Sequence, residues 1–65
     1  MTHEELVDRA TDLASALIRL ESIHQWVLDD EPTLRSVDVD VQSLVEHIAV
    51  AKENVDRALE LLRTA

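Results

Sequence analysis

The sequence predicts an all-α protein: an antiparallel two-helix hairpin that pairs with a second copy of itself into a four-helix bundle. Apolar residues recur at alternating spacings of three and four along most of the 65 residues, which is the period of one helix face. The pattern breaks once, in an acidic stretch that contains the only proline, Pro32. The two patterned segments have similar lengths, so a short turn between them folds them back on each other. We expect one domain over 1–65, with a helix over about 3–30, an acidic turn over about 31–37 and a helix over about 38–64.

The first helix opens on a capping-box pattern. The Thr2 hydroxyl can accept a hydrogen bond from the Glu5 amide, while the Glu5 carboxylate reaches back to the Thr2 amide. Acidic residues in this first turn also complement the positive end of the helix dipole. We therefore expect the helix to begin near His3. Its buried face, the first apolar stripe, comprises Leu6, Ala10, Leu13, Leu17, Leu20, His24 and Val27.

The acidic stretch is expected to end the first helix. Asp29, Asp30 and Glu31 place negative charge at the negative end of the helix dipole. Pro32 disfavours the α conformation at the residue before it. The helix should therefore end around Asp29 or Asp30.

The start of the second helix is marked by several competing signals. Ser36, Asp38 and Asp40 are all acceptable N-caps, and we place the start at Asp38, within about two residues. The alternation of valine and aspartate over 37–41 also fits a short extended segment, and one helical turn near 33–36 is a further alternative. Beyond the start, the spacing of three and four resumes without a slip. The second apolar stripe comprises Val41, Leu44, Ile48, Ala51, Val55, Ala58, Leu62 and Ala65.

Each predicted helix carries more apolar residues than one helix pair covers. Both stripes have apolar flanks, so they are wider than the two-position contact line of a coiled coil. Contiguous exposed apolar surface usually marks association. Two hairpins related by a two-fold axis would cover it as a homodimer, and a partner protein that supplies the missing helices is the alternative. The residues expected at or outside the edge of a single hairpin interface are Ile18, Trp26, Val50 and Leu61.

The composition excludes several classes of function. Without cysteine the chain forms no disulfide or thiolate metal site, and without glycine it has no phosphate-binding loop. A net charge of −8 opposes binding to nucleic acid and to anionic membranes. No apolar run approaches the roughly 20 residues of a membrane span, and the N-terminus lacks the pattern of a signal peptide. We therefore expect a cytoplasmic protein that needs no cofactor.

Glu21 and His24 are the strongest candidates for chemistry. A Glu-x-x-His pair on a helix supplies metal ligands in di-iron carboxylate bundles, where the partner helices add inward glutamates. The glutamates of the second helix all fall on its outward face, so we expect no metal site. The His24 ring is instead expected to form a hydrogen bond with a neighbouring residue or with water, and to fix the register of the helix packing. His3 and His47 have no nucleophile at a meaningful spacing, so we expect no enzymatic activity.

The turn and the end of the first helix form the candidate partner-binding surface. Trp26 is the only aromatic residue. It either packs against the second helix or the dimer mate, or it anchors an interface, where tryptophan is enriched. The turn beyond it carries five acids against one arginine. Together with the edge residues named above, the candidate binding residues are Trp26, His24, Asp29, Asp30, Glu31, Ile18, Val50 and Leu61.

We therefore expect a small, acidic, non-enzymatic protein–protein interaction module that acts as a helical-hairpin dimer. One alternative is an acidic inhibitor or nucleic-acid mimic, of phage or mobile-element type, that captures a basic protein. Another is an RNA-binding regulator, because the size and hairpin design resemble the small RNA-binding helical-hairpin dimers of plasmid copy control. The same design resembles the acidic helical-hairpin chaperones of secretion systems. The six basic residues are scattered among acids, which makes nucleic acid the weaker expectation.

Overall fold

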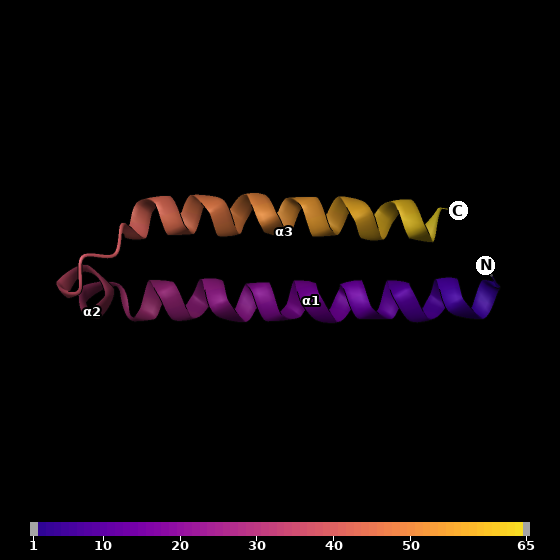
Figure 1. Cartoon of the computed structure of the whole chain (residues 1–65), viewed down its shortest axis with the longest axis horizontal. Coiled ribbons are helices and arrows are strands. Elements are labelled where there is room, and N and C mark those ends of the chain that lie inside the picture. Colours follow the sequence, from indigo (N-terminus) through magenta and orange to yellow (C-terminus); the bar gives the residue numbers. More distant parts are fainter. Residues whose placement is uncertain (1, 65) are drawn as a thin grey trace.

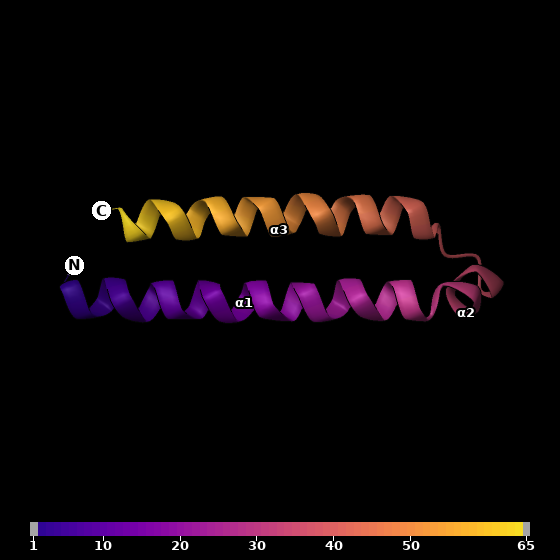
Figure 2. The ribbon, with the colours of Figure 1, turned by 180° about the vertical axis from the view of Figure 1, so that it is seen from behind.

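Three helices form a narrow rod in the computed structural model, which describes residues 2–64. They are α1 (His3–Asp29), α2 (Glu31–Ser36) and α3 (Val41–Arg63), and the described residues contain no strand. α1 packs along α3 in the opposite direction, with both chain ends at one end of the rod and α2 at the other (Figure 1). The view from behind shows the same side-by-side arrangement (Figure 2). The rod measures 49 × 14 × 14 Å.

α1 begins and ends within a residue of the predicted positions. The Thr2 hydroxyl accepts a hydrogen bond of 3.1 Å from the Glu5 amide, which is the first half of the predicted capping box. At the other end, the Asp30 amide donates to the Trp26 carbonyl oxygen over 2.9 Å. The helix ends at Asp29, with Asp30 as its C-cap, although no glycine follows it.

The segment predicted as an acidic turn is mostly helix. The prediction placed a turn over about 31–37, and the structure has the six-residue α2 there. The reason lies in Pro32, which occupies the first turn of α2, where its fixed φ suits a helix and its missing N–H is not needed. Glu31 and Arg35 add an ion pair one turn apart, with the Arg35 Nη2 atom 2.8 Å from Glu31 Oε1. Pro32 thus separates α1 from α2 while helping α2 to form.

The link from α2 to α3 is a Schellman motif built without glycine. The Val39 amide donates to the Leu34 carbonyl oxygen over 3.1 Å, and the Asp38 amide donates to the Arg35 carbonyl oxygen over 3.2 Å. Asp38 has a φ of 63°, the left-handed conformation that glycine usually supplies. Leu34 and Val39 both pack on the core, which is the apolar contact expected of this motif.

α3 begins at Val41, three residues after the predicted start at Asp38. Asp38 cannot be the N-cap, because its left-handed backbone belongs to the end of α2. Asp40, one of the other candidates, fills that role: its carboxylate accepts a hydrogen bond of 3.1 Å from the Ser43 amide. Ala65, the last predicted member of the second apolar stripe, lies outside the described residues, as does Met1.

The core is thin and is concentrated near the turn. Val27, Val41 and Ile48 form a buried cluster, and Leu59 is the fourth buried side chain among residues 2–64. The other described members of the two stripes are half-buried, so both stripes face the contact between α1 and α3 as predicted. Eight large apolar side chains remain exposed, namely Val7, Ile18, Ile23, Trp26, Leu28, Val37, Val50 and Leu61.

Two substitutions in this link are expected to have opposite effects. Asp40→Ala removes the cap of α3 and should cost about 1 kcal/mol of unfolding free energy. Asp38→Gly relieves the left-handed conformation and should gain about 0.5 kcal/mol, after the extra entropy of glycine in the unfolded chain is subtracted. Thermal unfolding followed by circular dichroism measures both, at roughly 4–8 °C per kcal/mol for a domain of this size.

Asp38→Asn serves as the charge control for this pair, because asparagine also tolerates the left-handed region. Its unfolding temperature should stay near that of the native protein. A lower unfolding temperature for both Asp38→Gly and Asp38→Asn would show that the carboxylate of Asp38, rather than its backbone, supports the link.

Candidate functional site

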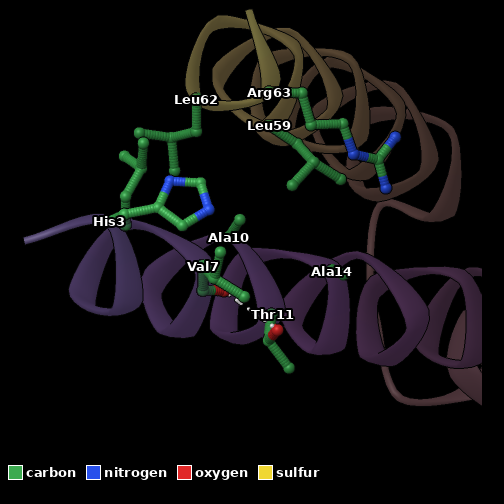
Figure 3. A pocket seen from close by; sticks show the side chains of 9 residues that line it. His3, Val7, Ala10, Thr11, Ala14, Leu59, Leu62 and Arg63 are labelled. Atoms are coloured by element: carbon green, nitrogen blue, oxygen red, sulfur yellow. Dashed lines mark hydrogen bonds between the residues drawn. The ribbon is translucent and has the colours of Figure 1, made fainter. Parts of the chain in front are cut away.

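A groove of about 380 Å³ opens between α1 and α3 near the chain ends (Figure 3). Its floor is hollow on the α1 side because Ala10 and Ala14 have small side chains. Figure 3 shows Leu59 between the His3 ring on one side and the Arg63 side chain on the other. The groove is therefore apolar inside and carries the His3 ring and the Arg63 guanidinium group at its edge. Its lining residues are His3, Leu6, Val7, Ala10, Thr11, Ala14, Leu59, Leu62 and Arg63.

The exposed apolar residues of α1 fall on two sides of the helix pair. Ile18 lies four residues after Ala14 and Leu28 fourteen after it, so both share the helix face that lines the groove. Trp26 precedes Leu28 by two residues, which places it about 200° away around the helix. Ile23, three residues before Trp26, lies near it. We call the first surface, with Val7, Ala14, Ile18 and Leu28, the groove side.

The exposed apolar residues of α3 lie away from the groove. Leu61 follows the groove residue Leu59 by two positions, which again is a rotation of about 200°. Val50 lies eleven residues before Leu61, close to three full turns, so the two share one helix face. We call the surface that carries Ile23, Trp26, Val50 and Leu61 the tryptophan side.

The structure thus divides the predicted edge residues between two surfaces. Trp26, Val50 and Leu61 belong to the tryptophan side, with Trp26 51% exposed. Ile18 is 67% exposed and belongs to the groove side. The four residues therefore do not form one continuous binding surface.

The predicted acidic residues have local structural partners. Asp29 accepts a hydrogen bond of 3.0 Å from the Gln25 side chain, and Glu31 accepts two from Arg35. The backbone carbonyl of Asp30 accepts from the Leu34 amide over 3.0 Å, which joins α1 to α2. Asp40 caps α3. Three of the five carboxylates at the turn, those of Asp29, Glu31 and Asp40, thus have hydrogen-bond partners within the chain.

His24 of α1 contacts Lys52 of α3. The Lys52 ammonium group lies 3.2 Å from His24 Nδ1, between residues 28 positions apart, and both side chains are half-buried. Because an ammonium group can only donate, Lys52 is the donor in this contact and the ring nitrogen is the acceptor. The pair therefore provides a polar contact between α1 and α3 that depends on register.

The groove residues were absent from the predicted site. His3 and Arg63 stand near opposite ends of the sequence, and only the packing of α1 along α3 brings them to one opening. The sequence carried one usable signal, the pair of alanines at positions 10 and 14 in and beside the first apolar stripe. Small residues on one helix facing leucines on the other leave a hollow.

Other classes of site find no support in residues 2–64. No three histidine, aspartate or glutamate side chains there come together to hold a metal ion. In the same part of the chain, no helix has the length and apolar run needed to cross a membrane. Comparisons with protein-family models, curated proteins and solved structures found no match to this chain.

The contact between His24 and Lys52 predicts a measurable coupling. A double-mutant cycle of His24→Ala and Lys52→Met should give a coupling energy of about 0.5–1.5 kcal/mol, the usual net value of a hydrogen bond. Methionine keeps the length of the lysine stem and removes the donor. Unfolding in urea measures the four variants.

Arg57→Met is the matched control, since Arg57 is exposed on the same helix. It should change the unfolding free energy by less than about 0.5 kcal/mol, with no coupling to His24→Ala. A coupling for Lys52 that is equally small would show that the contact does not hold the two helices in register.

Proposed function

We propose that this protein is a non-catalytic protein–protein interaction module that acts as a homodimer of helical hairpins. The observation that carries the proposal is the set of eight exposed large apolar side chains on a rod with four buried ones among its described residues. Such a surface is stable in water when another apolar surface covers it. Two hairpins packed face to face form a four-helix bundle, in which each helix contacts two neighbours.

The exposed area supports the same conclusion. The chain exposes 5054 Å², whereas a folded monomeric protein of 7.3 kDa exposes roughly 4,200 Å². The excess, on the order of 900 Å², is close to the roughly 800 Å² that each partner buries in an interface of standard size. The radius of gyration is 15.1 Å, against about 11 Å for a compact domain of this length. A second copy therefore supplies the amount of contact that the single rod lacks.

The proposal assigns the two apolar surfaces to different partners. A two-fold interface through one side of the helix pair leaves the opposite side facing water. The uncovered side is then available to another protein, and the interaction rests on apolar contact, because most acids of the turn already have local partners. On the tryptophan side, Trp26 is the residue type that most often anchors such contacts.

The proposal predicts a dimeric mass in solution and a stability that depends on concentration. Light scattering after gel filtration should give twice the 7.3 kDa mass of the chain. The unfolding temperature should rise with protein concentration, because dissociation accompanies unfolding. A folded monomer whose unfolding temperature is the same at all concentrations would refute the proposal.

A further inference from the structure

We infer that the groove between α1 and α3 is filled by Leu28 of a second copy, with the two rods antiparallel and a two-fold axis beside Ile18. This inference rests on the proposed homodimer and specifies which surface forms it. It gives the groove an occupant and leaves the tryptophan side uncovered.

The first step is the symmetry of the groove side. A two-fold interface uses the same patch on both partners, so a residue on one side of the axis contacts a residue on the other. Val7 lies eleven residues before Ile18 and Leu28 lies ten after it. At 1.5 Å per residue these are nearly equal distances of about 15–17 Å along α1. An axis beside Ile18 therefore places Leu28 of each copy over Val7 of the other.

The second step is the fit between Leu28 and the groove. Val7 lines the groove, so a side chain over Val7 is over the groove. Leu28 is 47% exposed in the single chain, which leaves much of its side chain available for burial in a partner. Its insertion covers Leu59 and Leu62, which form the α3 wall of the groove. One apolar residue thus covers the apolar hollow of the other copy.

The third step is charge. The groove edge carries His3 and Arg63, while Leu28 is followed in sequence by Asp29, Asp30 and Glu31. The antiparallel arrangement brings the acidic turn of one copy toward the groove end of the other, where Arg63 and His3 stand beside the acidic first turn of α1. The parallel alternative places the two acidic turns side by side, since each turn lies at one end of its rod (Figure 1). Opposed like charges disfavour that alternative.

Engineered cysteines test the arrangement directly, because the chain contains no native cysteine. Chains with Val7→Cys are unfolded and refolded together with chains with Leu28→Cys, and the mixture is then oxidised. Ile18→Cys is oxidised alone, as the probe of the axis. Ile23→Cys and Leu61→Cys, on the tryptophan side, are the matched controls. All five positions are exposed in the single chain, and circular dichroism confirms that each variant folds.

The inference predicts a disulfide-linked pair from the Val7→Cys and Leu28→Cys mixture and a linked dimer from Ile18→Cys. Val7→Cys alone, Leu28→Cys alone and both controls should give only traces of linked product. In addition, acrylamide should quench Trp26 fluorescence efficiently in the dimer, because the tryptophan side stays in water.

Each other result overturns the inference in a recognisable way. Linked dimers from Val7→Cys alone and Leu28→Cys alone would show a parallel dimer. Linked controls, or strong protection of Trp26 from quenching, would place the interface on the tryptophan side. A dimeric mass without any of the predicted links would place Leu28 outside the groove. These three results leave the proposed dimer intact, whereas a monomeric mass by light scattering refutes the dimer itself.

Discussion

The structure depends on one constraint, which is that two helices share a single line of contact. A long helix pair buries one stripe of each helix, however many apolar residues the helices carry. Val27, Val41, Ile48 and Leu59 are the buried side chains among the described residues, and only Val27 is fully buried. The narrow rod, the groove at its open end and the two apolar sides all follow from this limit. A chain of this size usually meets such a limit with disulfides, a metal ion or a partner, and the lack of cysteine excludes the disulfides.

The reversal of the chain shows how far local sequence rules reach. The rule that proline ends a helix placed the end of α1 correctly, yet the same proline starts α2, because the first turn of a helix tolerates it. The rule for N-caps could not choose between Asp38 and Asp40, since both side chains can accept from a helix amide. The choice depends on the backbone. Asp38 adopts a φ of 63° so that Leu34 and Val39 can both pack on the core, and no glycine marks that position in the sequence.

The buried stripes were predictable and the site was not, for one physical reason. The stripes are a property of each helix alone, so the spacing of three and four determines them. The groove depends on which residues of α3 lie opposite Ala10 and Ala14, and the sequence contains no direct information about that register. Distance from the first stripe alone does not separate Ile18 from Trp26, because the two residues lie on opposite sides of it and only the direction of rotation around the helix distinguishes them. The contact of His24 with Lys52 also depends on register, because the alignment of α1 with α3 brings these two side chains together.

Net charge affects whether such a rod would form an open filament or a closed dimer. A rod with two apolar sides can bind one copy on each side, and repetition of such contacts produces an open filament. A net charge of −8 opposes this growth, because every added copy brings more like charge into the assembly. The proposed pair would meet both conditions if it separates the two acidic turns and covers one apolar side. In the proposed dimer, the remaining side would carry Trp26 near the acidic turn, so like charge would oppose further self-association while Trp26 would be free to anchor a partner of opposite charge.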